Sequence, residues 1–291
     1  MKNLFFALCT LMVPASLLAL PIGNPGEASL HTNGVFWDKN EWCDCDPPPS
    51  FFDAFSIRLG YYGDFVFDRH LKVDRKNNRS QIHKTEINTN AVYLALNICN
   101  CFDLFGAVGA SKIDISTPSS AFGAQPTLVA AGLLNNQSVD IDTETTISWS
   151  AGLRGTLLQW GCLALGLEIQ YFRTQPHLNS VNAPDMDTFY FVNEERPLYH
   201  EWQVGFGAGY RINIADRSSA LIPYAGIKWS HCRFTSDNEQ TPLITLYDLE
   251  NNRDWGYAFG LTLLGCNKSS ITVEGRYRDE KALYVNGQFR F

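Results

Sequence analysis

The chain ends on the stretch Leu283-Tyr284-Val285-Asn286-Gly287-Gln288-Phe289-Arg290-Phe291, in which apolar and polar residues alternate. Side chains of a β-strand point alternately to its two faces, so this stretch predicts a strand with one apolar and one polar face. The same alternation occurs in soluble sheets. The rest of the chain therefore has to decide what kind of sheet this strand belongs to.

Nine further runs of the same alternation precede the last one, and they begin near residues 55, 91, 102, 147, 163, 202, 224, 255 and 271. Each run places aromatic and branched aliphatic residues on one face and glycine, hydroxyl or charged residues on the other. The sequence therefore predicts an all-β protein of about ten antiparallel strands, with twelve also possible.

The connections between these runs alternate in length. Long segments cover about 69–84, 112–143, 174–199 and 234–252, whereas short turns fall near 99–101, 159–161, 215–218, 266–268 and 279–280. Short turns on one side and long loops on the other are typical of an outer-membrane β-barrel, with the turns in the periplasm. We therefore expect a transmembrane barrel with both termini in the periplasm, closed by a terminal strand whose apolar face contains Val285, Phe289 and Phe291.

Composition agrees with a membrane barrel. Charged residues make up 18% of the 291 residues, against about 25% in a typical soluble chain. Hydrophobic residues reach 45%. After residue 20, however, no stretch approaches the roughly 20 apolar residues of a membrane helix. The net charge of −7 argues against nucleic acid as a partner, because phosphates attract basic surfaces.

The chain divides into three expected parts. Residues 1–19 carry Lys2 and the apolar run Leu4 to Leu18, which predicts a signal peptide removed after Ala19. Residues 20–53 contain Trp37, Trp42 and three consecutive prolines, and we expect a periplasmic N-terminal segment there. Residues 54–291 form the predicted barrel.

Eight cysteines are present, and one of them, Cys9, lies in the predicted signal peptide, which leaves seven. Six of these fall at the predicted periplasmic end and are candidates for disulfides: Cys43, Cys45, Cys99, Cys101, Cys162 and Cys266. Only Cys232 falls at the outer rim. Intramolecular bridges at the barrel floor and cross-links to neighbouring envelope proteins both remain open. The spacing does not favour a metal site, and no cofactor is predicted.

Charged residues on the polar parity are expected to line the interior of the barrel: Arg58, Asp64, Arg154, Glu168, Arg211, Lys228, Glu274, Arg276, Arg278 and Arg290. They are consistent with a mixed-charge path for ions and small polar solutes, or with an ion-pair network that fills a closed barrel. Gly205, Gly207 and Gly209 occupy three successive inward positions, which favours some open space, with sheet curvature as the alternative.

Three segments resemble the chlamydial major outer membrane porin family. They are Leu20-Pro21-Ile22-Gly23-Asn24-Pro25, the run Gly60 to Arg69 (GYYGDFVFDR), and the ending with Val273-Glu274, Arg276, Asp279-Glu280 and Val285 to Phe291. The resemblance implies an outer-membrane barrel, general diffusion of small solutes, and disulfide-linked packing in the envelope of the infectious particle. This chain is shorter than the principal porin of that family, and a ten-stranded barrel is narrow.

Other functional classes are less well supported. His70, His83, His177, His200 and His231 fall near the predicted outer half without a distinctive catalytic spacing, so we do not expect an enzyme. A structural shell protein or adhesin remains an alternative. The apolar patch 128–134 is expected to pack within its loop, although an inward constriction or a binding surface is also conceivable. Expected partners are membrane lipid, the barrel-assembly machinery, cysteine-rich envelope proteins and further copies of the chain.

Overall fold

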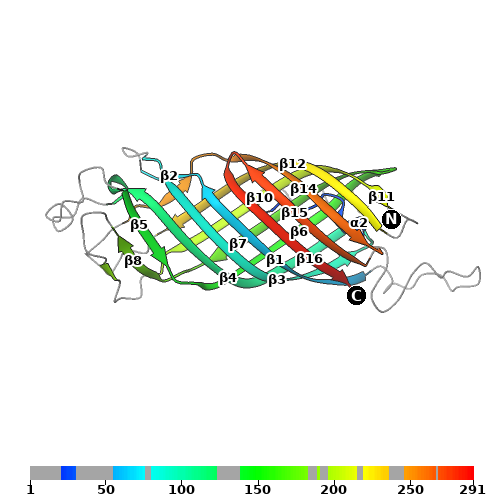
Figure 1. Cartoon of the computed structure of the whole chain (residues 1–291), viewed down its shortest axis with the longest axis horizontal. Helices are drawn as coiled ribbons and strands as arrows, with labels where there is room; N and C mark the ends of the chain where they lie inside the picture. The colour runs from blue at the N-terminus through cyan, green and yellow to red at the C-terminus, as the bar shows by residue number, and fades with distance from the viewer. Residues whose placement is uncertain are drawn as a thin grey trace, which may run out of the picture.

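The computed structural model describes residues 21–30, 55–75, 80–122, 138–182, 189–190, 196–214, 219–235, 246–266 and 268–291. Ten long strands form the wall of a closed barrel (Figure 1). They are β1 (Phe55–Arg69), β3 (Lys84–Ile98), β4 (Phe102–Pro118), β6 (Thr146–Trp160), β7 (Leu163–Thr174), β10 (Leu198–Tyr210), β12 (Ser219–Thr235), β14 (Trp255–Gly265), β15 (Ser269–Tyr277) and β16 (Glu280–Arg290).

Every wall strand pairs antiparallel with the next wall strand along the chain, and the last pairs with the first. In that closing pair, Val285 lies opposite Gly63 and Phe289 opposite Leu59. The backbone N–H of Phe291 donates to the carbonyl of Ile57 at 2.8 Å, one position beyond β16. The predicted all-β fold, with its ten-stranded antiparallel barrel, is confirmed, and a twelve-stranded count is not needed.

Shorter elements lie at the barrel ends and inside it. They are α2 (Glu27–Leu30), β2 (Leu71–Val73), the 3-10 turn η2 (Ser119–Ala121), β5 (Ser138–Thr143), β8 (Leu178–Asn182), β9 (Phe189–Tyr190), β11 (Ile212–Ile214) and β13 (Leu249–Asn251). In the described ranges, no helix is long and apolar enough to cross a membrane.

Alternation along the strands puts apolar side chains outside and polar ones inside over most of the barrel length. On β4, Leu104 and Val108 are exposed outward, whereas Asp103 and Ser111 are fully buried inward. A soluble sheet would bury its apolar face instead. Exposed apolar residues around a polar interior indicate a surface that meets lipid.

At the loop end the polarity of the two faces is reversed. Further along β4, Ile113 and Ile115 are buried inward, while Lys112 and Asp114 face outward. The same strand therefore passes from a membrane-type to a water-type arrangement near residue 111. The outward apolar band ends there, which places the membrane boundary at this level.

The inward apolar residues of the loop end form one hydrophobic cluster. It unites wall strands with the short strands β2, β5, β8 and β13, through residues such as Leu71, Ile113, Val139, Val181, Phe234 and Leu249. Burial of these side chains stabilises the loop end as a packed cap over the barrel interior. In Figure 1 this cap lies at the end opposite the C-terminus.

The predicted long loops are shorter than expected. We took residues from about 112 to 143 as a loop, yet β4 continues to Pro118 and β5 begins at Ser138. The lengths of the strands were underestimated because apolar and polar residues exchange faces where the strands leave the membrane. The apolar patch 128–134 lies outside the described residues.

The β3–β4, β6–β7 and β14–β15 turns lie at the other end, as the alternation of connection lengths predicted, whereas the short link between β15 and β16 lies at the loop end, beside His70. The β3–β4 turn uses positive φ angles of 54° and 53° at Cys99 and Asn100, as in a tight hairpin. Gly161, with φ 59°, serves the β6–β7 turn. The C-terminus lies at this end of the barrel, and α2 lies near it (Figure 1).

One domain prediction needs correction. We expected residues 20–53 to lie in the periplasm, but Pro21 to Leu30 are within the barrel, where all of them except the half-buried Ser29 are buried. They fill the space that inward glycines leave, as shown below. The predicted signal peptide 1–19 and residues 31–53 lie outside the described residues.

Candidate functional site: the charged barrel interior

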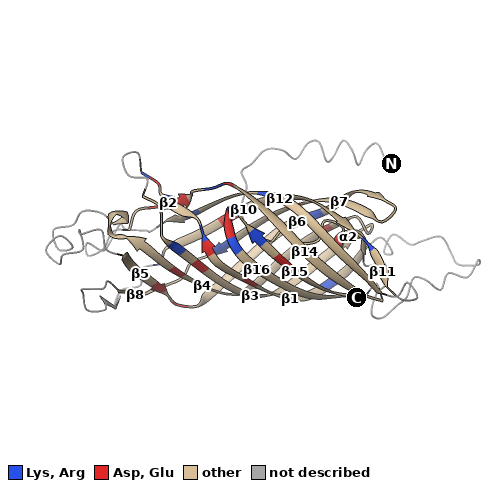
Figure 2. Cartoon of the chain, turned by 45° about the horizontal axis from the view of Figure 1, so that its top comes forward, with Lys and Arg blue, Asp and Glu red and all other residues tan. Residues whose placement is uncertain are grey.

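The barrel interior holds a set of charged side chains contributed by eight wall strands. They are buried because the polar parity of each strand points away from lipid, and buried charges require partners. Figure 2 shows acidic and basic positions interleaved on the strands in the middle of the barrel. The interior is therefore an ion-pair network built from the whole circumference.

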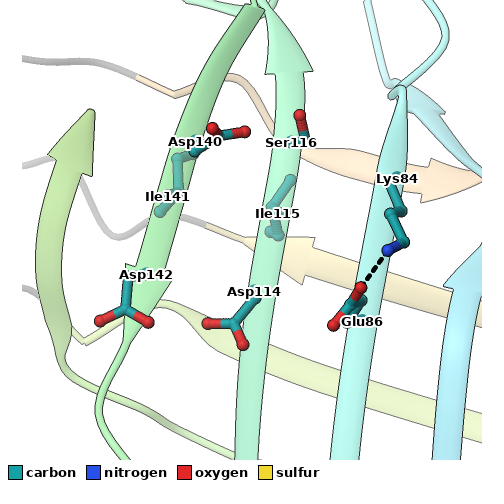
Figure 3. Close-up of a pocket in the computed structure, with 8 residues that line it drawn as sticks. All are labelled: Lys84, Glu86, Asp114, Ile115, Ser116, Asp140, Ile141 and Asp142. Atoms are coloured by element: carbon teal, nitrogen blue, oxygen red, sulfur yellow. Dashed lines mark ion pairs between the residues drawn. The ribbon is translucent and has the colours of Figure 1, made fainter. Parts of the chain in front are cut away.

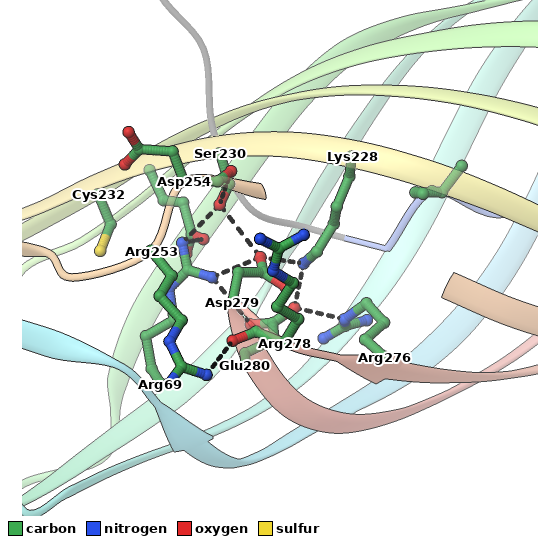
Figure 4. Close-up of polar contacts among 12 residues, drawn as sticks. Arg69, Lys228, Ser230, Cys232, Arg253, Asp254, Arg276, Arg278, Asp279 and Glu280 are labelled. Atoms are coloured by element: carbon green, nitrogen blue, oxygen red, sulfur yellow. Dashed lines mark hydrogen bonds and ion pairs between the residues drawn. The ribbon is translucent and has the colours of Figure 1, made fainter. Parts of the chain in front are cut away.

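One part of the network centres on Arg276 of β15. Its Nη2 donates to Asp64 of β1 at 2.6 Å, and its Nε donates to Glu280 of β16 at 2.6 Å. Lys228 of β12 pairs with the same Glu280 and with Asp279 at 3.0 Å. Figure 4 shows Lys228 and Arg276 converging on Glu280, and with Asp64 three distant segments of the chain are thereby joined.

Arg69 extends the network toward the hydrophobic cap. Its guanidinium lies 2.8 Å from Asp279 and 3.0 Å from Glu201 of β10, and it donates to Ser230 at 2.9 Å. Arg69 ends β1, directly below the apolar cluster. Ion pairs in the middle and apolar packing above them together close the interior on the loop side.

A second group of charges lies toward the short-turn end. Arg58 pairs with Asp103, which also accepts a hydrogen bond from Asn97 at 2.6 Å. Arg154 pairs with Glu168 on the neighbouring strand β7. Arg290 donates to Asn100 at 2.8 Å.

The segment 21–30 occupies the space between these charges. The backbone N–H groups of Ile22 and Gly23 donate to the two carboxylate oxygens of Glu274 at 3.1 and 2.9 Å. Tyr224 donates to the same carboxylate at 2.9 Å. Backbone groups removed from water need partners, and Glu274 supplies them here.

The helical turn α2 adds a charge of its own to the interior. Glu27 pairs with Arg154 and accepts a hydrogen bond from Gln288. Its carbonyl accepts from Arg58 at 3.2 Å, and the carbonyl of Ala28 accepts from Asn97 at 2.9 Å. The segment is thus held by both its side chains and its backbone.

Apolar contacts fix the two ends of the segment. Leu30 packs against Ala220, Ile222 and Leu264 at the short-turn end. At the other end, a Cβ at Gly205 would lie 2.9 Å from the Ile22 side chain, and one at Gly166 would overlap the carbonyl of Pro25. The segment packs against the inward glycines, where side chains are absent. The open space that we predicted from these glycines is therefore filled.

The predicted lining residues divide into two groups. Eight are buried on the inner face: Arg58, Asp64, Arg154, Glu168, Lys228, Glu274, Arg276 and Arg290. Arg211 is half-buried beyond the end of β10, where its Nε donates to Asn213 at 3.0 Å. Arg278 is exposed, because the chain turns there with φ 92° and breaks the parity of β15. Both residues therefore lie outside the ten wall strands.

Several interior residues were missed by the sequence patterns. Asp103 and Glu201 lie on the inward parity of strands that we identified, so alternation alone could have found them. Asp279 and Glu280 were assigned to a turn, and turns are usually exposed. Glu27 gave no signal, since four residues of helix outside any strand pattern do not predict burial inside a barrel.

The described cysteines are free thiols. Cys99, Cys101, Cys162 and Cys266 are exposed at the short-turn end, and Cys232 is buried in the cap. Partial burial raises the pKa of Cys101, and the neighbouring Cys99 raises it further. Cys43 and Cys45 lie outside the described residues, so the predicted disulfides among the six candidates stay predictions.

The histidines form no shared site in the part of the chain that is described. His70 lies 3.6 Å from Asp68, and His83 lies 3.4 Å from the hydroxyl of Ser138. Partial burial lowers the pKa of His70, although Asp68 acts in the opposite direction. Within the described ranges, no group of three or more His, Cys, Asp or Glu side chains is suited to a metal ion.

A known protein family matches nearly the whole chain. The model of the Chlamydia major outer membrane protein family matches residues 1–82, 75–197, 192–245 and 240–291. The chain belongs to the Chlamydia major outer membrane protein family. It is therefore an outer-membrane protein, in agreement with the apolar outer surface of the barrel.

Relatives of the family cover nearly the whole chain. A major outer membrane porin of Chlamydia pneumoniae is 32% identical over 376 positions, covering 95% of each chain. Porins of Chlamydia abortus and of Chlamydia trachomatis serovar F are 32% and 30% identical, again over 95% of this chain and at least 95% of theirs. These relatives are named porins and not enzymes.

Two further comparisons concern length and fold. The alignment with the Chlamydia pneumoniae porin runs over more positions than the 291 residues of this chain, so that relative of the Chlamydia major outer membrane protein family carries additional segments. Among solved structures, the β-domain of the Bordetella autotransporter BrkA aligns with 82% of this chain and all of that one, with a TM-score of 0.42 and 10% identity.

Proposed function

We propose that this protein is a porin-like barrel through which ions and small polar solutes pass when residues 21–30 leave the interior and the hydrophobic cap at the loop end opens. The observation that carries the proposal is the position of this segment, which lies between Glu274, Arg154 and the inward glycines. The porin names of the relatives support diffusion as the function.

The physical basis is the small size of the interior. Ten strands enclose little more than the eight-stranded barrels that side chains fill completely. Removal of the segment would leave a groove along Gly166, Gly205 and Gly207, bordered by Glu274 and Arg154. A path of mixed charge suits small ions and polar solutes better than apolar ones.

A reversible lock on the segment tests this function. An ideal Cβ on Gly26 lies 3.0 Å from the Cβ of Ala164 on β7, so the double variant Gly26→Cys/Ala164→Cys can form a disulfide after a shift of about 0.5 Å. The four exposed native cysteines are replaced by Ser in this background. The purified protein is then measured in planar lipid bilayers, before and after reduction.

We expect no current steps from the oxidised double variant and clear steps after reduction. Each single variant serves as a control and should conduct under both conditions. Equal conductance of the oxidised and reduced double variant would show that the segment does not control the path. Absence of current in every form would instead favour a closed barrel.

A structural role is the second candidate, and the four exposed thiols at one end of the barrel favour it. In this role the barrel is anchored to cysteine-rich neighbours through intermolecular disulfides. Non-reducing electrophoresis of native envelopes should then show high-molecular-weight species that collapse to a monomer on reduction. A single monomer band without reductant argues against this role. Assembly into homo-oligomers and adhesion to host cells stay predictions.

A further inference from the structure

We propose that an outward row of basic side chains on β7, β10 and β12 binds the phosphate groups of lipids in the leaflet at the loop end. His200 lies directly opposite Arg173 on one side and Arg233 on the other. Directly opposed side chains of an antiparallel pair lie about 5 Å apart at Cβ. The three side chains are therefore adjacent across three strands.

The row faces away from the barrel interior. The residues that alternate with it, among them Phe172, Tyr199 and Phe234, are buried in the hydrophobic cap. Arg173 is exposed, and the side chain of Arg233 is 51% exposed. His200 is half-buried between them.

Aromatic side chains place this row at the membrane boundary. Tyr171 and Trp202 lie one position closer to the barrel middle on the same outward face, with ring centroids 4.7 Å apart. Trp149 of β6 adds a ring 5.3 Å from Tyr171. Aromatic rings of membrane proteins gather at the level of the lipid headgroups. Two residues of strand span about 7 Å, so Arg173 lies just beyond this level.

The charges of the row call for an anion from outside the chain. Like charges close together across a sheet are destabilising. Among the described residues, Arg173 has no hydrogen-bond or ion-pair partner, whereas Arg233 lies 3.3 Å from Asp74 and directly opposite Glu250 of β13. A phosphate between Arg173 and Arg233 would compensate both guanidinium groups. Arginine is well suited to this, since its planar fork matches phosphate geometry.

A second basic pair lies on the β14 and β15 side of the barrel, separated from Arg233 by Glu250 of β13. Arg253 donates to the carbonyl of Arg278 at 3.3 Å, and Arg278 donates to the hydroxyl of Tyr257 at 3.0 Å. The Arg278 guanidinium lies 5.6 Å from the centre of the Tyr257 ring. This pair repeats the arrangement of an arginine above an outward aromatic residue.

The surface on β3, β4 and β5 has the opposite character. Glu86, Asp114, Asp140 and Asp142 surround a shallow hollow of about 400 Å³ there, with Lys84 at its edge (Figure 3). Carboxylates repel phosphate, so lipid phosphates are expected to gather on the side of β7 to β12. This difference also supplies a control surface on the same molecule.

The test compares lipid binding of two variants of the full chain in detergent micelles. Arg173→Gln/Arg233→Gln removes charge from the proposed row, and Lys84→Gln/Lys112→Gln removes the same charge from the control surface. The probe is lipid A, with dephosphorylated lipid A and inorganic phosphate as comparisons, and bound lipid is counted by native mass spectrometry. Both variants alter exposed side chains, and thermal unfolding of each verifies the fold.

We expect the Arg173→Gln/Arg233→Gln variant to bind lipid A about thirtyfold more weakly, equivalent to about 1 kcal/mol for each basic residue lost near an anionic surface. The control variant should bind like the unmodified protein. Equal affinity of both variants overturns the proposal. So does equal binding of the dephosphorylated lipid, or full competition by inorganic phosphate at the lipid concentration.

Discussion

Arg276 illustrates how the interior depends on single side chains. It is buried and lies 2.6 Å from both Asp64 and Glu280. Replacement by Met would leave carboxylates in the interior with fewer cationic partners, and loss of one member of a buried pair typically costs about 3–5 kcal/mol. We therefore expect Arg276→Met to lower the free energy of unfolding by that amount, measured by urea denaturation in lipid vesicles.

The matched control is Lys281→Met on the next strand. Lys281 pairs with Asp68 at 3.2 Å, but its side chain is 57% exposed. Exposed pairs contribute at most about 1 kcal/mol, so this variant should unfold close to the unmodified protein. Similar losses in both variants would contradict the interior network as a stabilising feature.

Cys101 allows a prediction about reactivity. Partial burial holds the pKa of its thiol above the ordinary value of about 8.5. Less thiolate is then present at pH 7, and the thiolate is the reacting species. In a variant that retains only Cys101, alkylation by a maleimide should be slower than that of glutathione at pH 7, and its rate should rise until pH exceeds 8.5. A rate equal to glutathione at pH 7 would contradict the raised pKa.

At the scale of single side chains, sequence patterns predicted well which strand residues point inward, and they predicted residues in turns poorly. Eight of ten predicted lining residues are inside because their strands alternate regularly up to that position. Arg278 failed because one residue with φ 92° changes the direction of the chain. Glu274 was predicted to line the interior, but that its carboxylate would bind backbone N–H groups of Ile22 and Gly23 follows only from the folded structure.

At the scale of elements, β4 contains both environments of the barrel. Val108 is outward and 62% exposed in the apolar band, while Asp140 of the neighbouring strand β5 faces outward beyond it. A charged residue on the lipid face near the bilayer middle costs about 2–4 kcal/mol. We expect Val108→Arg to destabilise the barrel by about this amount, and Asp140→Arg to have little effect. Unfolding in lipid vesicles measures both.

The reversed polarity of strands also explains why element boundaries were hard to predict. The search for apolar and polar faces recognised all ten wall strands, because lipid imposes a strict alternation. It ended β4 near residue 111, where the outward residues become Lys112 and Asp114. A strand that passes from lipid to water keeps its alternation, but the apolar residues move from the outward to the inward face. A search for one continuous apolar face therefore ends at that point.

The whole molecule has a polarity along its axis that can be tested. The capped loop end should face the exterior, and the short turns with both termini should face the periplasm, as an even strand number requires. In intact cells, a membrane-impermeant maleimide should label an Asp140→Cys variant. Cys162 at the short-turn end should react only after the outer membrane is permeabilised. Labelling of Cys162 in intact cells would reverse the proposed orientation.

The path of the chain through the interior could not have been predicted from local patterns. Alternation defines a wall, but whether the wall encloses water or protein depends on residues that lie outside the wall. Here the decisive residues are Ile22, Pro25 and Glu27, which come from a segment without strand periodicity. The inward glycines were the one sequence signal for this path. They lack side chains, and Ile22, Pro25 and Glu27 fill the space that side chains would have occupied.

The placement of Ile22 beside Glu274 has a practical consequence for tagging. A fluorescent or affinity domain fused directly before Pro21 would have to fit inside the narrow barrel with this segment, or it would displace the segment from the interior. Reporter insertions are better sited just after Pro118 at the end of β4, beyond the level at which the outward apolar band ends.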